Sequence, residues 1–152
     1  MSAKQIVIDA SAALKWRLRD EEATAQADAL LDDFLAGDVE LITPTLFDYE
    51  ITNALKVAAV RGRISESDAA DAITDFQELE IKRRDFAEVQ TLAFQLACQF
   101  QRSAYDSAYV ALAQANGIWF YTGDRRLFNA LGKQLPWVKW IGDYRLDLVP
   151  TT

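Results

Sequence analysis

The sequence predicts an α/β fold in the form of a three-layer α/β/α sandwich with a mostly parallel central sheet. Short apolar runs rich in β-branched residues alternate with longer segments in which apolar side chains recur every three or four positions. Strands that alternate with helices usually pair in parallel, and the crossover helices cover both faces of the sheet. The 152 residues contain no linker, repeat or low-complexity segment, so we expect a single domain over residues 1–152.

The first half of the chain is expected to contain two buried strands and three helices. Ile6-Val7-Ile8 and Leu41-Ile42-Thr43 are short apolar runs typical of buried strands. Gly37 and Gly62 mark helix ends, and Pro44 suits the first position of a helix. The expected order is a strand at 6–8, a helix at 10–16, a helix at 24–36, a strand at 41–43 and a helix at 44–60.

The second half continues this alternation. Ser65 and Ser103 are placed to cap helices, each with an aspartate three residues on, and Asn116-Gly117 is a helix stop signal. The expected elements are a helix at 65–79, a weak edge strand at 80–83, helices at 86–100 and 103–116, a strand at 118–122, a short helix at 124–131 and a strand at 138–141.

The composition excludes several classes of chemistry. The chain has no histidine, which removes a Ser-His-Asp triad, histidine acid–base catalysis and imidazole zinc sites. Its one cysteine, Cys98, lies in an apolar stretch and is expected to be a small buried side chain. No apolar run approaches the ~20 residues of a membrane helix, and residues 1–15 lack a signal-peptide pattern. We therefore expect a cytoplasmic protein.

Four carboxylates stand where an ordinary folding pattern would place apolar or neutral residues: Asp9, Glu50, Asp106 and Asp124. Asp9 and Asp124 follow strands, and sites in open α/β sheets form beyond the carboxyl ends of strands. Glu50 and Asp106 lie near the starts of helices that could leave the same edge. Carboxylates brought together raise one another's pKa, and a bound divalent cation removes that cost. The four acids are thus candidate catalytic and metal-binding residues.

Each acid also has a purely structural interpretation. Asp9 and Asp124 could cap the helices that follow them, and Ser103-x-x-Asp106 is an acceptable capping box. Glu50 is spaced to face the apolar stripe of its helix, where no lysine or arginine lies at a neighbouring helical position to pair with it. These interpretations do not explain why all four acids should fall at one edge of the sheet.

Four segments together resemble the PIN-domain nucleases, and more narrowly the VapC-type toxins of toxin–antitoxin pairs. Each segment is weakly specific alone, but their order and spacing are similar to that family over almost the whole chain. The segments are Ile6-Val7-Ile8-Asp9-Ala10-Ser11-Ala12-Ala13-Leu14-Lys15-Trp16, Pro44-Thr45-Leu46-Phe47-Asp48-Tyr49-Glu50-Ile51-Thr52-Asn53-Ala54-Leu55, Ser103-Ala104-Tyr105-Asp106-Ser107-Ala108-Tyr109-Val110-Ala111-Leu112-Ala113 and Thr122-Gly123-Asp124-Arg125-Arg126-Leu127.

The resemblance implies a site, an activity and partners. It implies that Asp9, Glu50, Asp106 and Asp124 bind Mg²⁺ or Mn²⁺ and cleave single-stranded or loop regions of RNA. The hydroxyls of Ser11 and Thr122 fall at family positions that support the acidic centre. The resemblance further implies a homodimer and a cognate antitoxin, a segment of which lies across a hydrophobic groove and blocks the site.

Contacts to an RNA substrate are expected from a local basic rim. The net charge of −7 argues against a uniformly basic binding surface but not against such a rim. Lys15 follows Asp9 in sequence, and Arg125 with Arg126 follows Asp124, which makes these three cations candidate substrate-binding residues. Each could equally be a solvated charge at the end of a helix.

Two other functions compete with a nuclease. A phosphatase or receiver domain acting through a phospho-aspartate is disfavoured, because such an enzyme would carry a second acid two residues after Asp9, where Ser11 stands. The chain could instead be a non-toxin PIN-like or partner-binding protein with an unused acidic site. Its groove would then draw on four aromatic residues for which core packing is the simpler explanation: Trp16, Phe47, Trp137 and Trp140.

Overall fold

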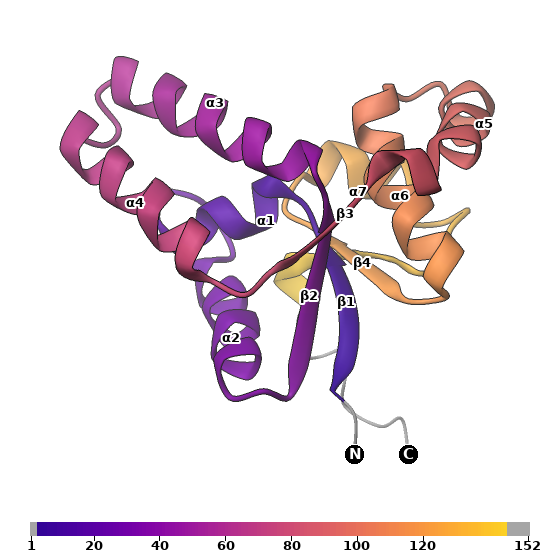
Figure 1. Cartoon of the computed structure of the whole chain (residues 1–152), viewed down its shortest axis with the longest axis horizontal. Coiled ribbons are helices and arrows are strands. Elements are labelled where there is room, and N and C mark those ends of the chain that lie inside the picture. Colours follow the sequence, from indigo (N-terminus) through magenta and orange to yellow (C-terminus); the bar gives the residue numbers. More distant parts are fainter. Residues whose placement is uncertain (1–2, 146–152) are drawn as a thin grey trace.

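A five-stranded sheet forms the middle layer of the molecule, and its strands pair in parallel throughout (Figure 1). The computed structural model describes residues 3–145. The strand order is β3-β2-β1-β4-β5, so the strand that begins the chain lies at the centre. The strands are β1 (Lys4–Ile8), β2 (Val39–Pro44), β3 (Lys82–Arg84), β4 (Trp119–Thr122) and β5 (Val138–Trp140).

Alternating side chains of the central strands build two separate cores. Ile6 and Ile8 of β1 pack into one core, whereas Val7 between them packs into the other. Strand β4 repeats this division, with Tyr121 in the first core and Phe120 in the second. A strand buried on both faces reads as a continuous apolar run, which is why the sequence marks these strands so clearly.

Helices cover both faces of the sheet, as the sandwich prediction requires (Figure 1). Helices α1 to α4 lie on one side, where α3 and α4 pack together as an antiparallel pair, and α5 to α7 lie on the other. The helices are α1 (Ala10–Ala13), α2 (Thr24–Leu35), α3 (Leu46–Val60), α4 (Glu66–Glu78), α5 (Gln90–Phe100), α6 (Ala104–Asn116) and α7 (Arg125–Leu131), with the 3-10 turns η1 (Leu14–Trp16), η2 (Phe86–Glu88) and η3 (Ile141–Asp143).

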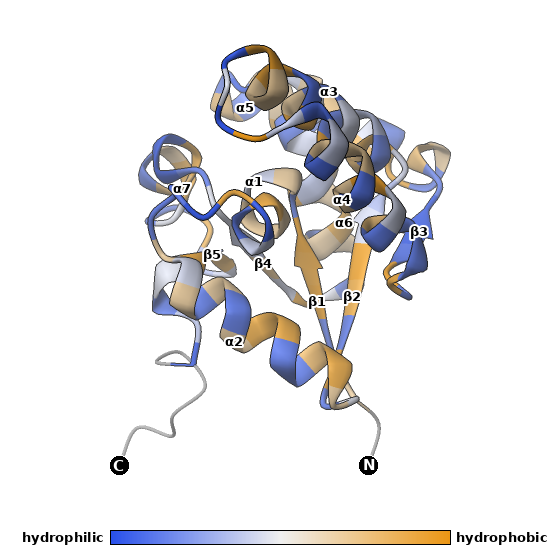
Figure 2. Cartoon of the chain, turned by 90° about the vertical axis from the view of Figure 1, so that its left-hand side faces the viewer, coloured by the Kyte–Doolittle hydropathy of each residue, from blue (hydrophilic) through white to orange (hydrophobic). Residues whose placement is uncertain are grey.

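The hydropathy of the elements follows their position. Strands β1 and β2 are mostly apolar in the middle of the sheet, whereas the edge strand β3 is hydrophilic (Figure 2). The weak edge strand expected around 80–83 is therefore confirmed as β3. Among residues 3–145, no helix is both long and apolar enough to cross a membrane.

Three sequence expectations need correction. Pro44 does not open a helix but ends β2 opposite Arg84, and α3 begins two residues later at Leu46. The helix expected at 86–100 is divided into η2 and α5, because Val89 between them departs from helical geometry, with φ −125° and ψ 10°. Cys98 is exposed, because α5 packs against the core with the opposite face, which carries Ala93 and Leu96.

Candidate functional site

Asp9 lies at the carboxyl end of the central strand, where β1 turns into α1. Its Oδ1 accepts hydrogen bonds from the Ser11 hydroxyl at 2.7 Å and from the Ala12 backbone N–H at 2.9 Å. The second of these is the N-cap contact of α1, so Asp9 does cap this helix, and Ser11 supports the cap instead of replacing it. Asp9 is 7% exposed, and burial raises the pKa of its carboxyl although these hydrogen bonds oppose the shift.

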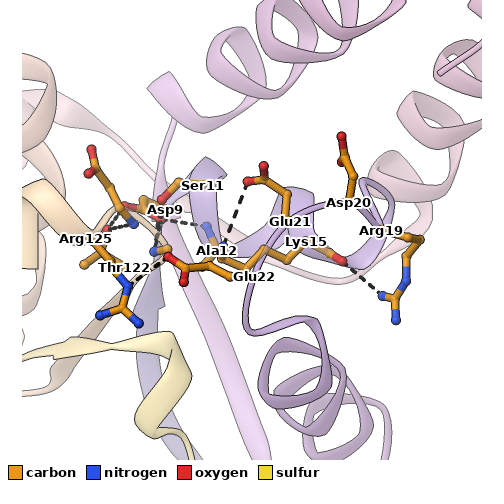
Figure 3. Close-up of polar contacts among 12 residues, drawn as sticks. Asp9, Ser11, Ala12, Lys15, Arg19, Asp20, Glu21, Glu22, Thr122 and Arg125 are labelled. Carbon is orange, nitrogen blue, oxygen red and sulfur yellow. Dashed lines mark hydrogen bonds and ion pairs between the residues drawn. The ribbon is translucent and has the colours of Figure 1, made fainter. Parts of the chain in front are cut away.

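The end of β4 meets Asp9 from the neighbouring strand (Figure 3). Ile8 pairs with Tyr121 in the parallel register, which brings Thr122 alongside Asp9. The Thr122 hydroxyl donates to Asp9 Oδ2 at 2.5 Å, and the Gly123 backbone N–H donates to Ser11 Oγ at 3.0 Å. The two strand ends are thus joined by hydrogen bonds that converge on one carboxylate.

Gly123 allows this close approach because it has no side chain. A Cβ at this position would lie 2.5 Å from the backbone carbon and oxygen of Ser11, which is much closer than atoms of this kind approach. The chain after β4 can therefore pass directly over the start of α1 only with glycine here. This packing fixes the position of Asp124, the next residue.

Glu50 reaches the same edge of the sheet from α3. Its Oε1 accepts a hydrogen bond of 2.5 Å from the hydroxyl of Tyr109, which lies in α6 on the other side of the sheet. Tyr109 is 2% exposed, and burial together with the nearby Glu50 raises its pKa, so the hydroxyl keeps its proton and acts as a donor. The half-buried Glu50 therefore has a tyrosine partner, which explains how α3 tolerates it without a basic neighbour.

Asp106 lies in the first turn of α6. Ser103 caps this helix by accepting a hydrogen bond from the Asp106 backbone N–H at 3.0 Å, as the sequence pattern predicts. The Asp106 carboxylate does not complete the capping box, because it accepts a hydrogen bond from Arg102 Nη2 at 3.2 Å. The side chain is about one-third exposed, so the carboxylate remains accessible to solvent and ligands.

Asp124 is the N-cap residue of α7. Its Oδ1 accepts hydrogen bonds from the backbone N–H groups of Arg126 at 2.9 Å and Leu127 at 3.3 Å. Its own backbone N–H donates to Thr122 Oγ1 at 3.0 Å, the same oxygen that serves Asp9. The capping interpretation thus holds for this residue, whose backbone is nevertheless linked to the Asp9 centre through one hydroxyl.

The acids differ in how closely they approach one another. Glu50 lies near enough to Asp9 and Asp106 that, after burial itself, the negative charges of both raise the pKa of its carboxyl, while the Tyr109 hydrogen bond opposes the shift. As the side chains stand within residues 3–145, no three acidic or cysteine side chains form a closed ligand set. The structure therefore places Asp9, Glu50 and Asp106 in one electrostatic neighbourhood, with the Asp124 carboxylate turned toward its helix.

The donor set suits a hard cation. All four candidate ligands present carboxylate oxygens, the class of ligand that Mg²⁺ and Mn²⁺ prefer. Mg²⁺ usually keeps several of its waters in a protein site, so it does not require direct contact with every acid. The pKa values of Asp9 and Glu50 are raised because their negative charges are buried with too little compensation. A bound divalent cation would supply the missing positive charge.

The three cations expected to bind substrate differ in exposure, and Figure 3 shows two of them, Lys15 and Arg125, together with Asp9. Lys15 is only 2% exposed, with Glu21 3.9 Å away, whereas Arg125 is well exposed and donates to Glu22 at 2.9 Å. Arg126 is exposed at the start of α7. Lys15 and Arg125 both lie over the ring of Trp140, at 5.5 and 4.6 Å from its centroid, so burial leaves Arg125 more available than Lys15 for an RNA contact.

The sequence did not lead us to name two residues of this site, Tyr109 and Arg102, as candidates. Tyr109 lies three residues after Asp106, one helical turn along the same face of α6, and Arg102 lies four residues before it. That spacing could have indicated both, because residues three and four apart are neighbours on a helix surface. What it could not indicate is that Tyr109 contacts Glu50, which is 59 positions away.

The aromatic residues considered for a partner groove are mostly core residues. Phe47 is fully buried, and Trp16 and Trp140 are 8% and 6% exposed. Trp137 is partly buried against the second core. The core-packing interpretation is therefore correct for these residues, and the exposed apolar surface of residues 3–145 is found elsewhere.

Comparison with known proteins agrees with this architecture. A PIN domain family model matches residues 6–134. Ribonuclease VapC12 of Mycobacterium tuberculosis is 33% identical over 127 residues, covering 84% of this chain and 92% of that protein. Ribonuclease VapC3 of Pyrobaculum aerophilum is 35% identical over 125 residues, covering 81% and 92%.

A solved structure shares the fold. The crystal structure of PAE2754 from Pyrobaculum aerophilum matches with a TM-score of 0.57 and 22% identity, covering 86% of this chain and 87% of that one. The residues matched by the family model include the ends of β1 and β4 and the starts of α3 and α6. The chain belongs to the PIN-domain family and, within it, to the VapC ribonucleases.

Proposed function

We propose that the protein is a Mg²⁺- or Mn²⁺-dependent endoribonuclease that hydrolyses RNA phosphodiester bonds at Asp9, Glu50, Asp106 and Asp124. The observation that carries this proposal is the shared electrostatic neighbourhood of Asp9, Glu50 and Asp106 at the carboxyl edge of the sheet. Two of these carboxyls have raised pKa values and no cationic partner among residues 3–145, a combination typical of functional sites.

The metal would be held mainly by Asp9, Glu50 and Asp106, with Asp124 completing the set. When bound, such a cation lowers the pKa of a coordinated water and neutralises charge that develops on the phosphate. The protein's own hydrogen bonds supply the rigid part of the site. Ser11, Thr122 and the N-terminus of α1 hold Asp9, and Tyr109 holds Glu50. A carboxylate fixed in this way needs little rearrangement to bind a cation.

The proposal is tested by replacing the ligands without changing their shape. Asp9→Asn and Asp106→Asn should each reduce cleavage of a single-stranded RNA in Mg²⁺ or Mn²⁺ by at least about 100-fold, since each removes a charge on which the reaction depends. Asp28→Asn is the matched control, because Asp28 is an exposed acid of α2 that pairs with Arg19. Folded Asp9→Asn and Asp106→Asn proteins that cleave at the parental rate would exclude this site.

The toxin role and the antitoxin partner are proposed together. The VapC relatives support a ribonuclease, and a trough beside α2 and α4, apolar in its smaller part, supports a bound antitoxin segment. One part of the trough is a hollow of about 170 Å³ that Arg17 and Asp75 border; its apolar lining is Trp16, Leu31, Phe76 and Leu79. The trough continues along Leu79 into a hollow of about 420 Å³, where apolar Phe34, Leu35 and Val39 lie beside the charged Glu40, Glu78, Glu80 and Lys82. Leu35 is 65% exposed, which an amphipathic segment of the antitoxin would cover.

A homodimer is supported by a second apolar surface. A groove of about 280 Å³ separates the first turns of α3 and α6, and it contains Tyr49 and Tyr105, which are 77% and 64% exposed. We name it the tyrosine groove; its lining is Thr45, Leu46, Tyr49, Phe86, Ala104, Tyr105 and Ala108. We propose that a second copy of the chain covers it. Since Tyr49 and Tyr105 directly precede Glu50 and Asp106, such a dimer would border the acidic site.

A further inference from the structure

Arg102 is the one cation that forms an ion pair with a member of the acidic group among residues 3–145. Its Nη2 lies 3.2 Å from Asp106 Oδ2, whereas Asp9, Glu50 and Asp124 form no ion pair with any of residues 3–145. One proposed metal ligand, Asp106, is therefore already paired with a positive side chain of the protein, Arg102. A cation that binds Asp106 must compete with it.

The contact between Arg102 and Asp106 is looser than three other arginine–aspartate pairs of the protein. Arg19 with Asp28, Arg63 with Asp20 and Arg83 with Asp48 each form two hydrogen bonds. Arg102 forms one, and its Nε is buried with no hydrogen-bond partner. A guanidinium with a buried, unpaired donor is not at its best attainable position, since an unsatisfied buried donor is unfavourable.

The backbone of Arg102 is held in place, although its guanidinium forms only one hydrogen bond. Helix α5 ends at Phe100, and Gln101 turns the chain with a left-handed φ of 53°. The Arg102 backbone N–H then donates to Ala97 O at 3.2 Å, and Ser103 caps α6. The side chain is 28% exposed. The Arg102 side chain thus extends from a fixed backbone beside Asp106 and is partly open to solvent.

We propose that Arg102 is a phosphate-binding residue that Asp106 holds until a metal arrives. In the metal-free protein it is the counter-ion of Asp106. When a divalent cation takes the carboxylate, the guanidinium turns to a phosphate oxygen of the bound RNA strand, where its planar donors can form two hydrogen bonds. An ion pair that is partly open to solvent and held by one hydrogen bond is weak enough for this exchange. The inference rests on the proposed nuclease function and adds to it a substrate contact outside the four acids.

The first test is metal affinity, measured by calorimetric titration of Mn²⁺ into the metal-free protein. Arg102→Gln should bind Mn²⁺ about two- to fivefold more tightly than the wild type, because the competing charge is gone. Arg145→Gln is the matched control, because it also removes one positive charge and one ion pair. Its partner Asp33 lies in the last turn of α2, next to the start of β2, whereas the acids lie at the carboxyl ends of the strands. This control should bind Mn²⁺ within twofold of the wild type.

The second test is RNA affinity with Mn²⁺ present. It uses fluorescence anisotropy of a short single-stranded RNA that a gel shows to be intact after the titration. Arg102→Gln should bind this RNA about five- to tenfold more weakly. The slope of log affinity against log salt concentration should decrease by the amount expected for about one phosphate contact. In EDTA the variant and the wild type should bind RNA alike, since Asp106 then holds Arg102.

The opposite signs of the two effects separate this role from a structural one. A residue that merely supports α6 would weaken Mn²⁺ and RNA binding together when replaced, and that result would overturn the inference, as would unchanged Mn²⁺ affinity. Should Arg102→Gln not fold, Arg102→Lys keeps the charge and must retain the Mn²⁺ affinity and salt dependence of the wild type. If the wild type itself binds no Mn²⁺ and cleaves no RNA, the proposed function fails, which is a different outcome from a failure of Arg102.

Discussion

The hydroxyl of Thr122 donates a hydrogen bond of 2.5 Å to Asp9 Oδ2 across 113 positions of sequence. The same oxygen accepts from the Asp124 backbone N–H, so Thr122 connects two of the four acids. Thr122→Val keeps the shape of the side chain but removes both bonds. It should lower the free energy of unfolding by about 1–3 kcal/mol, because buried polar groups lose their partner. Thr122→Ser keeps the hydroxyl and should be milder; equal losses in urea unfolding of both variants would contradict this account.

Gly123→Ala should be among the most damaging single-methyl changes in the chain. The added Cβ would overlap the backbone of Ser11, so β4 and α1 must separate, at a cost of about 1–3 kcal/mol. Gly37→Ala is the control, since Gly37 has a left-handed φ of 83° but open space around it. That variant should lose only about 1 kcal/mol. Thermal unfolding distinguishes the two, and similar losses would show that contact with Ser11 does not constrain Gly123.

Tyr109→Phe should damage the acidic site more than the packing of the core. The ring of Tyr109 stacks on Phe120 with centroids 5.8 Å apart, and phenylalanine keeps that contact. What is lost is the hydrogen bond to Glu50, so we expect Mn²⁺ affinity and RNA cleavage to fall by about tenfold, close to 1.4 kcal/mol. Tyr144→Phe serves as the control, because it also removes a tyrosine hydrogen bond to a carboxylate, here one of 2.6 Å to Asp33 in the last turn of α2. Full cleavage activity in Tyr109→Phe would mean that Glu50 needs no partner.

The raised pKa of Glu50 makes the stability of the metal-free protein depend on pH. Burial and repulsion from Asp9 and Asp106 favour the protonated carboxyl, so the stabilisation from this group is complete below its ordinary pKa of 4.5 and is lost as pH rises through the raised value. At neutral pH in EDTA, Glu50→Gln should therefore melt about 2–4 °C above the wild type.

The difference between Glu50→Gln and the wild type should shrink as the pH falls toward 4.5, where Glu50 itself becomes protonated. Saturating Mn²⁺ should reverse the order, because only the wild type offers the full set of carboxylates. Glu80→Gln, which changes an exposed acid between α4 and β3, should show neither effect. Melting curves in which Glu50→Gln is less stable than the wild type in EDTA would refute this prediction.

The tyrosine groove makes the homodimer testable. Tyr105→Ser removes much of its exposed apolar surface and should shift the protein from dimer toward monomer in light scattering coupled to size-exclusion chromatography. Phe94→Ser is the control, because Phe94 is equally exposed, at 68%, but lies in α5 outside the groove. A wild-type protein that is monomeric at all concentrations would rule out the dimer, and a Phe94→Ser monomer would place the interface elsewhere.

Local residue patterns are sufficient to predict the order and type of the elements. Buried parallel strands must be apolar on both faces, so β1, β2 and β4 stand out as runs, and cap residues such as Ser65, Ser103 and Gly117 mark helix ends. Errors arose where two local rules compete. Pro44 is acceptable both at the start of a helix and at the end of a strand, and pairing with β3 decided for the strand.

The hydrogen bonds and the ion pair that support the acids depend on contacts between distant parts of the fold. Parallel register brought Thr122 to Asp9, the packing of α3 and α6 at the same sheet edge brought Tyr109 to Glu50, and the turn after α5 brought Arg102 to Asp106. Lys15, a candidate substrate contact by sequence position, is buried beside Trp140. Contacts across 59 or 113 positions follow from how the helices and strands pack, and no local pattern of residue types encodes that geometry.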